Sequence, residues 1–413
     1  MNRFNFFITV TILIMGGVTC AEDNPQSLPS IPFKALKSID KPIQYHTPPP
    51  PRGVLKEVKE IMNVEKAWKG FNVSGNGMYA AVLDTGLYSV HPDFAGHVIL
   101  PGRNFTSTDI SDTDDKNGHG THVTGIISAN GNENVGIAPN TNIIPIKVIS
   151  DDGVNSDMKW IKEALEWIIK YNKKNQKKLI TVINISAQTT ENNYCWKKNN
   201  NCENPYDTYA ITEIRKIIKQ LRDSKVVVVA ASGNGFGTDV DKGCFIEQGM
   251  AFPAIIPEVI SVGSVYDKDI NEVVQYPCGA KVNRKVVRNI TPTSRRLYDV
   301  KGNGTDFFAP GSAVLSSGLL ADGHSKSKEG TSQAAPAVAG VILLLQEFWF
   351  KQTNQFPTVE QVENWLHQGG KKILDVSLTP NADNVGHTGL AFDFVDANGA
   401  LTKAKEDLKN NHL

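Results

Sequence analysis

The chain has 413 residues and carries 43 basic and 43 acidic side chains, so its formal net charge is zero. Apolar residues make up 40% and charged residues 21% of the sequence, which excludes the low-hydrophobicity, high-charge composition of a disordered chain. The balanced charge gives no whole-molecule reason to expect nucleic acid or an anionic membrane as a partner. The length allows about two or three average domains, and a core of that size is stable without metal or disulfide bonds.

The chain starts with the pattern of an export signal. Arg3 precedes an apolar run of ten residues, Phe6 to Met15, and small residues follow. Ten residues are too few to span a bilayer, so residues 1–21 are predicted to be a cleaved signal peptide and the protein is predicted to be secreted. Cys20 leaves anchoring as a lipoprotein as an alternative. No later apolar run is long and uninterrupted enough to predict a transmembrane segment.

Four of the five cysteines follow the signal, and four cysteines allow three pairings. In an exported chain disulfides are favoured over free thiols, and the spacing matches no common zinc pattern. Cys195 and Cys202 flank a short polar loop, so we predict a bond between them. Cys244 and Cys278 would then form a second bond.

The rest of the chain divides by composition into three parts. Residues 22–55 are rich in proline and lack periodicity, which is typical of an extended linker or a short pro-segment. Residues 56–402 are predicted to form one large domain, and residues 403–413 a C-terminal tail. The predicted buried strands of the domain are continuous in Val, Ile and Ala; they are Tyr79 to Asp84, Ile143 to Ile149, Ile180 to Ser186, Val226 to Ala231 and Val259 to Val265.

Helical patterns alternate with these strands. Apolar residues fall on one stripe in Asp157 to Lys170 and again in Thr208 to Leu221, and Ser156 or Asp157 is placed to cap the first of these helices. A third apolar helix is predicted over Val338 to Leu345. The repeated order of strand, helix and strand predicts an α/β fold with three layers, in which helices cover both faces of a mostly parallel, twisted sheet.

Polar residues suited to chemistry fall at predicted strand ends and beside glycines. Asp84 closes the first strand, His119 lies in NGHGTH, Asn234 follows a later strand, and Ser332 precedes the third helix. An open parallel sheet binds its ligands at the carboxyl ends of its strands. A serine hydroxyl becomes a nucleophile when an imidazole accepts its proton, and a carboxylate orients that imidazole. An Asn amide can then donate to the charge that develops on a substrate carbonyl.

The sequence resembles the subtilisin-like serine proteases, the subtilases of peptidase family S8. The resemblance extends from about Val64 to Leu401 and is carried by motifs that stand in the same order as in the family. These are AAVLDTGLYSVHPDF around Asp84, NGHGTHVTGIIS around His119, NIS at 184–186, ASGN ending at Asn234, FAPG at 308–311, GTSQAAPAVAG around Ser332 and FVDANGAL near the end.

The resemblance assigns a role to each candidate residue of a serine endopeptidase. Asp84 would orient the histidine, His119 would be the general base and then the general acid, and Ser332 would form the acyl-enzyme. Chemistry alone does not choose between His119 and His122; the resemblance selects His119. The Asn234 side chain and the Ser332 backbone N–H would form the oxyanion hole.

The resemblance also implies a substrate-binding pocket for the P1 side chain, the S1 pocket. Ser186, Ala187 and Gln188 would line one side of it, and Ala231, Ser232 and Gly233 the other. Gln188 departs from the glycine that is usual in the family, so the P1 preference is left open.

Two acidic features have more than one interpretation. Asp93 resembles the carboxylate ligand of a structural calcium site, with the oxygen-rich loop Asn130 to Asn134 as its companion, so Ca²⁺ is a candidate cofactor. The acidic run Asp109, Asp112, Asp114 and Asp115 precedes His119. It is interpreted either as a solvated loop or as a field that favours basic substrate residues or holds a cation.

The expected partners are protein or peptide substrates of a monomeric enzyme. Residues 22–55 are too few for the folded pro-domain of many subtilases, so the enzyme either folds unaided or receives an inhibitor or pro-domain supplied separately. Two rival functions belong to other classes. A catalytically silent binding relative would have lost a triad or oxyanion residue, and a dinucleotide-binding module would need a Gly-x-Gly-x-x-Gly turn after the first strand; neither feature is found.

Overall fold

The structure is a computed structural model. It describes residues 55–131, 134–153, 156–187, 208–236, 248–269, 271–276, 279–283, 286–298, 304–377 and 383–411. All of these fall in the unit Pro32–Leu413. The predicted signal peptide, the cysteines Cys195, Cys202, Cys244 and Cys278, and Gln188 lie outside the described residues, so the disulfide assignments stay predictions.

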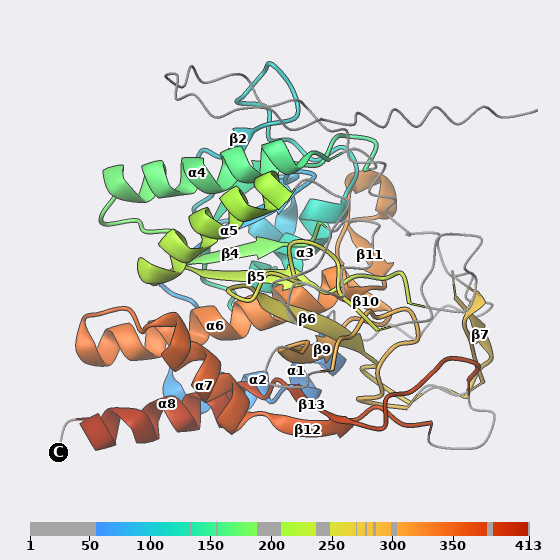
Figure 1. Ribbon diagram of the computed structural model, residues 1–413. Coiled ribbons are helices and arrows are strands. Elements are labelled where there is room, and N and C mark those ends of the chain that lie inside the picture. The colour runs from blue at the N-terminus through green and yellow to red at the C-terminus, as the bar shows by residue number, and fades with distance from the viewer. Residues whose placement is uncertain are drawn as a thin grey trace, which may run out of the picture. The chain divides into compact units, whose positions relative to one another are not determined.

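A nine-stranded sheet organises the part of the chain that the structure describes (Figure 1). Its order is β12-β13-β9-β6-β5-β4-β1-β3-β2, and only β12 runs antiparallel to its neighbour. The strands are β1 (Tyr79–Asp84), β2 (Arg103–Asn104), β3 (Asn142–Lys147), β4 (Val182–Ile185), β5 (Val227–Ala231), β6 (Ile260–Val265), β9 (Phe307–Pro310), β12 (Lys371–Leu374) and β13 (Ala391–Phe394).

Both faces of the sheet are buried, which explains the continuous apolar runs in the strands. In β1, Ala80 and Val82 belong to one hydrophobic cluster, whereas Ala81 and Leu83 belong to another. Successive side chains of a strand point to opposite faces. Each face therefore has a core of its own, as in parallel sheets that helices cover on both sides.

Helices α4 (Met158–Lys174) and α5 (Thr208–Asp223) lie on one side of the sheet, and α6 (Thr331–Thr353) lies on the other (Figure 1). The side chain of Asp157 caps α4 by accepting a hydrogen bond from the Lys159 N–H at 2.8 Å. The predicted fold class, a mostly parallel sheet between two helical layers, is confirmed.

Helix α6 is the central element of the core on its side of the sheet. Residues Thr331–Trp349 are all buried. Among the described helices it alone is long and apolar enough to cross a membrane, but 94% of its apolar window is buried within the protein. Its length and composition therefore reflect a core helix.

Further short elements surround this framework. They are α1 (Lys56–Ile61), α2 (Val64–Phe71), α3 (His119–Ser128), α7 (Val359–Gly369), α8 (Ala397–Asn411), two 3₁₀ turns (Pro92–Phe94 and Leu320–Asp322) and the hairpins β7–β8 (Val274–Gln275, Lys281–Val282) and β10–β11 (Val314–Ser317, Ser325–Lys328). Helix α8 continues past the predicted boundary at residue 402, with Ala404 fully buried and Leu408 packed on the core. The described residues 403–411 therefore belong to this helix and not to a separate tail.

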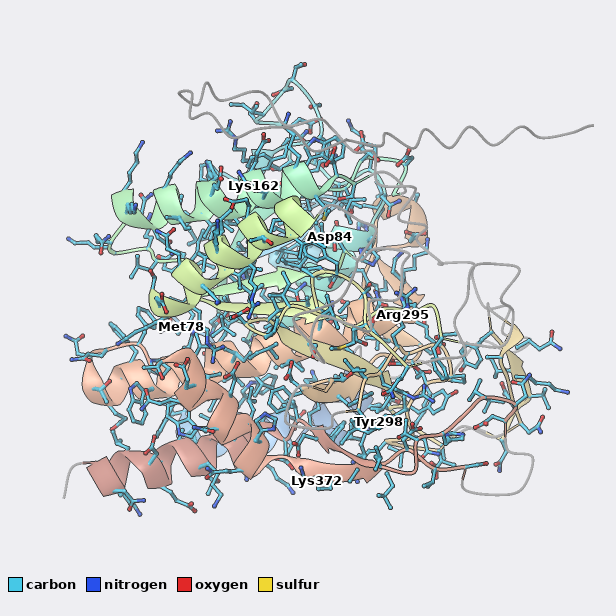
Figure 2. The ribbon with its side chains drawn as sticks, viewed as in Figure 1. Met78, Asp84, Lys162, Arg295, Tyr298 and Lys372 are labelled. Carbon is cyan, nitrogen blue, oxygen red and sulfur yellow. The ribbon has the colours of Figure 1, made fainter. Side chains whose placement is uncertain are left out.

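The direction in which strands are added to the sheet reverses at β1. Strand β3 pairs with one edge of β1 and β4 pairs with the other. Met78 directly precedes β1 and Asp84 is its last residue; Figure 2 labels both residues. Such a reversal opens a crevice at the carboxyl ends of the strands, where ligands bind in open α/β sheets. Asp84 therefore marks the edge at which a functional site is expected.

Candidate active site

Asp84 and His119 form a close pair at this edge. Asp84 is the last residue of β1 and fully buried, and His119 is the first residue of α3. His119 Nδ1 lies 2.7 Å from Asp84 Oδ1, and the Thr85 N–H donates to the same oxygen at 2.8 Å. The carboxylate therefore fixes the orientation of the imidazole and favours the tautomer that carries its proton on Nδ1.

His122 has a different environment, although it lies on the same helix. It is fully buried, and its Nε2 lies 3.0 Å from the carbonyl oxygens of both Val314 and Lys326. These two residues lie on opposite strands of the β10–β11 hairpin. His122 thus anchors that hairpin to α3, and of the two histidines it is His119 that pairs with Asp84.

Ser332 is the second residue of α6, in the first turn, where N–H groups have no carbonyl partner four residues earlier in the helix. Its Oγ donates to the Ser186 carbonyl oxygen at 3.1 Å, and Ser186 Oγ donates back to the Ser332 carbonyl oxygen at 3.0 Å. The start of α6 is therefore joined to the chain that leaves β4.

Asn234 approaches the same helix from the end of β5. Its Oδ1 accepts hydrogen bonds from the Thr331 N–H at 2.8 Å and from Thr331 Oγ1 at 2.9 Å. Thr331 Oγ1 in turn accepts from the Gly233 N–H at 3.0 Å. These contacts hold the amide oxygen, so Nδ2 is the group left to donate to a ligand. The sequence analysis did not assign this orienting role to Thr331.

Glycine is required at the helix start. Gly330 has φ of 148° and ψ of 174°, a backbone conformation that side chains disfavour. A Cβ atom at this position would lie 2.8 Å from Asn234 Nδ2. The absence of a side chain therefore lets Asn234 reach the first turn of α6.

The predicted S1 residues lie on two neighbouring segments. Ser186 and Ala187 follow β4, and Ala231, Ser232 and Gly233 end or follow β5; all five are buried. Strands β4 and β5 pair directly, so the two segments leave the sheet side by side. Both also contact the start of α6 through Ser186 and Gly233.

A positive charge lies close to one of these segments, which no sequence pattern indicated. The Arg295 N–H donates to the Gly233 carbonyl oxygen at 2.7 Å, and Ser232 Oγ donates to the Arg295 carbonyl oxygen at 2.7 Å. The Arg295 guanidinium packs against Gly235, because its Nη2 lies 2.5 Å from where a Cβ would be. In Figure 2, Arg295 is labelled below and to the right of Asp84.

A buried ionic cluster holds the segment that carries Arg295. Arg296 donates from Nε to Asp375 Oδ2 at 3.0 Å, and its guanidinium lies over the Phe236 ring. His387 contacts Asp375 and Asp383, and these hydrogen bonds raise the pKa of His387 to about 9. Burial acts to raise the pKa of Asp375, but its hydrogen bond with His387 and the charge of Arg296 lower it to about 2. The segments that carry Asp375 and His387 are thereby fixed to the segment that carries Arg295, next to the predicted S1 residues Ser232 and Gly233.

The acidic run before His119 divides into two kinds of residue. Asp109, Asp112 and Asp114 are exposed or half-buried, as the solvated-loop interpretation predicts. That interpretation is wrong for Asp115, which is only 3% exposed and whose carboxylate accepts hydrogen bonds from its surroundings. Lys116 lies 3.4 Å from Asp112 and 3.5 Å from Asp151, so the negative field of this loop is partly compensated.

The surroundings of Asp93 do not fit a calcium site. Its Oδ2 accepts hydrogen bonds from Ser317 Oγ at 2.6 Å and from Asn134 Nδ2 at 2.8 Å. Calcium requires about six to eight oxygen ligands that present lone pairs, whereas here two donors face the carboxylate. No group of three or more His, Cys, Asp or Glu side chains in the described residues is placed to hold a metal. Asn134 of the predicted loop offers its amide N–H to Asp93, while its own Oδ1 has no hydrogen-bond partner among the described residues.

Addition of a chelator should therefore leave the melting temperature unchanged. Ser317 and Asn134 already satisfy the Asp93 carboxylate, so removal of free Ca²⁺ would break no contact described at this position. Thermal unfolding with excess EDTA, and again with added Ca²⁺, measures this. A fall of several degrees in EDTA that added Ca²⁺ reverses would contradict the expectation.

The sequence matches the model of the Subtilase family, Peptidase_S8, over residues 75–375. This range contains β1, α3, β5 and the start of α6, and therefore all the elements that build the site. Since the match covers well over half of the chain, it shows the family to which the chain belongs.

Individual relatives agree with this assignment. The chain is 29% identical to the intracellular serine protease of Paenibacillus polymyxa, over 77% of each chain. It is 28% identical to the major intracellular serine protease of Bacillus subtilis, over 71% of this chain and 76% of the relative. It is 26% identical to subtilisin E of Bacillus subtilis, over 66% of this chain and 56% of the relative. The protein belongs to the subtilase family and is a serine endopeptidase of the subtilisin type.

Proposed function

We propose that the protein is a secreted endopeptidase that hydrolyses peptide bonds through an acyl-enzyme on Ser332. The observation that carries the proposal is the arrangement at the carboxyl edge of the sheet. The Asp84–His119 pair at the end of β1, Asn234 after β5 and Ser332 at the start of α6 supply a base, an oxyanion donor and a nucleophile.

The proton transfers follow from the Asp84–His119 geometry. With Nδ1 protonated and held by Asp84, the lone pair of His119 is on Nε2. As Ser332 Oγ attacks the substrate carbonyl, His119 accepts the hydroxyl proton, and Asp84 stabilises the imidazolium that results. His119 then gives this proton to the leaving amine. Water then attacks the acyl-enzyme, with His119 again accepting a proton, and the carboxylic acid product leaves Ser332.

The negative charge on the substrate oxygen has two donors. Thr331 holds Asn234 Oδ1, which leaves Nδ2 to donate to the oxyanion. The backbone N–H of Ser332 belongs to the first turn of α6 and supplies the second hydrogen bond. Both donors are held before substrate binds, so little reorganisation is needed when the charge develops.

Substrate would lie against Ser186 and Ala187 on one side and Ala231 to Gly233 on the other. The two segments are adjacent and joined to the start of α6. Protein and peptide chains are the proposed substrates, as expected of a serine endopeptidase of this family. Gln188 lies outside the described residues, and the P1 preference stays open.

A fluorophosphonate probe tests the proposal, because it reacts only with an activated serine. We expect the wild type to be labelled and Ser332→Ala to be unlabelled. Ser327→Ala is a matched control, since Ser327 is an exposed serine of the neighbouring hairpin, and it should label as the wild type does. Equal labelling of wild type and Ser332→Ala, or no labelling of the folded wild type, would reject the proposal.

The same experiment tests export. The apolar run after Arg3 supports a signal peptide over residues 1–21, so the labelled enzyme should be found in the culture medium of an expressing cell. Labelling confined to the cell lysate would overturn secretion without affecting the proposed chemistry. Two of the relatives above are named intracellular proteases, so labelled enzyme in the medium would separate the chain from them.

A further inference from the structure

Asp115 lies beside the proposed active site and is not part of the proposed chemistry. It is 3% exposed, and its carboxylate accepts five hydrogen bonds from neighbouring groups. Oδ1 accepts from Thr85 Oγ1 at 2.9 Å, the Asn117 N–H at 3.0 Å and the Gly118 N–H at 2.8 Å; Oδ2 accepts from the Thr121 N–H at 2.8 Å and Thr121 Oγ1 at 2.7 Å. A carboxylate with this many donors is committed to its acceptor role.

The donors come from the two segments that carry the Asp84–His119 pair. Thr85 directly follows Asp84, and Gly118 and Thr121 flank His119 in the first turn of α3. Thr85 Oγ1 strengthens the connection, because it also accepts the Gly120 N–H at 2.8 Å. One carboxylate and one hydroxyl thus join the end of β1 to the start of α3.

These bonds also account for the free N–H groups at the start of α3. Helix α3 has no side-chain cap at its N-cap residue, Gly118. Instead, Asp115 accepts the N–H groups of Gly118 and Thr121, Thr85 accepts that of Gly120, and Asn117 Oδ1 accepts that of His119 at 3.2 Å. Every N–H of the first turn is satisfied from the preceding loop or from β1.

The charge of Asp115 has a second effect on His119. The N-terminus of a helix carries a partial positive charge that disfavours a cation nearby. His119 occupies the first position of α3, where the proposed mechanism requires an imidazolium to form. A carboxylate bonded to the same turn offsets that partial charge and makes the imidazolium easier to form.

We propose that Asp115 is a positioning residue of the active site. It fixes the end of β1 relative to the first turn of α3, so that Asp84 contacts His119. It also offsets the partial positive charge of the helix N-terminus beside the imidazole. This inference rests on the proposed function, because its readouts are the kinetics of that chemistry.

The charged groups of the elements around α3 complete this picture. The helix packs against β1, β3, β10 and α6, and its His122 also contacts β11. Their charged residues are Asp84, Lys147, Lys326 and Lys328 of β11, and, far along α6 from Ser332, Glu347 and Lys351. Lys147 Nζ donates to the Asp114 carbonyl oxygen at 2.7 Å and pairs with Asp151, which lowers the pKa of the Asp151 carboxyl through a hydrogen bond. Lys116 of the preceding loop is exposed and lies between Asp112 and Asp151.

Asp115→Asn tests the proposal with Asp114→Asn as the matched control, since Asp114 is exposed and its neighbour in sequence. An amide has one acceptor oxygen where five donors converge, so the position of Asp84 relative to His119 should be held less firmly. We expect kcat to fall about ten- to a hundred-fold with KM nearly unchanged. The acid limb of the pH profile of kcat/KM should move to lower pH, because the imidazolium loses a stabilising charge. Asp114→Asn should behave as the wild type does.

A second pair of variants separates position from charge. Thr85→Val removes the hydroxyl between Asp115 and Gly120 but keeps the carboxylate, so kcat should fall without movement of the acid limb. Thr85→Ser keeps a hydroxyl and should retain more activity than Thr85→Val. This pair is measurable even where Asp115→Asn does not fold.

The outcomes distinguish this inference from the proposed function. An active wild type for which Asp115→Asn and Asp114→Asn have equal kcat and equal pH profiles would overturn the positioning role alone. A lower kcat in Asp115→Asn with the acid limb unmoved would also overturn the proposed role of Asp115, because a general loosening of the fold would then explain the lower kcat. An inactive, unlabelled but folded wild type would instead reject the proposed function itself.

Discussion

Asp84→Asn should lower kcat about ten-thousand-fold and leave KM nearly unchanged. Asp84 Oδ1 lies 2.7 Å from His119 Nδ1. A neutral amide at this position can donate to Nδ1, which would shift the imidazole proton to Nε2, the nitrogen that must accept the serine proton. The amide would also fail to stabilise the imidazolium. Steady-state kinetics on a peptide substrate measures the effect, and labelling by the fluorophosphonate probe should slow in parallel.

The stability of the same variant provides the control. Asp84 is fully buried, and its Oδ2 has no hydrogen-bond partner among the described residues. Burying a charge without full compensation destabilises a fold. Asp84→Asn should therefore unfold at the same temperature as the wild type or higher, despite its lost activity. A loss of activity below tenfold would contradict the role of Asp84. A large fall in melting temperature would show that the loss of activity comes from unfolding.

Asn234→Ala should lower kcat about a hundred- to a thousand-fold with little change in KM; the magnitude is that known for an oxyanion donor in subtilisin, a relative. Thr331 holds Asn234 Oδ1 through two hydrogen bonds, so Nδ2 is fixed before the reaction starts. The substrate carbonyl in the ground state gains little from this donor, whereas the oxyanion gains much. The loss should therefore fall on kcat.

The helix that Asn234 contacts should survive the substitution. Asn234 is half-buried, and α6 is held by its long buried face. Asn234→Ala should thus remain folded and bind substrate as before. An increase in KM at constant kcat would contradict the oxyanion role and would indicate that Asn234 contacts substrate in its ground state.

The sheet was predictable because burial on both faces produces continuous apolar runs in the sequence of its strands. The runs at Tyr79 to Asp84 and Val226 to Ala231 match β1 and β5 within one residue. Helix α4 has one buried stripe and a capping Asp157, which periodicity detects. Helix α3 was missed because all its residues are buried, so no stripe contrasts with a polar face. Its identification requires the tertiary contacts themselves.

The candidate site was only partly predictable for a similar reason. Motifs identified Asp84, His119, Asn234 and Ser332, but the residues that orient them leave no local signal. Asp115 resembles its acidic neighbours in sequence, and its burial depends on donors such as Thr85, thirty residues earlier in the chain. The Arg295 backbone pairs with Gly233 from a segment about sixty residues away, which brings its guanidinium against Gly235, and the sequence does not encode this pairing locally.

The proposed role of Ser332 would link catalysis to the completion of folding. The serine lies in the first turn of a helix whose residues 331–349 are all buried. Ser332 contacts Ser186 and its neighbour Thr331 contacts Asn234, and these partners follow strands β4 and β5, which the same helix covers. A chain whose core has not formed has no aligned serine and cannot cleave its neighbours. On the proposed mechanism, each newly made molecule would thus be a substrate for finished molecules before it could cleave anything itself.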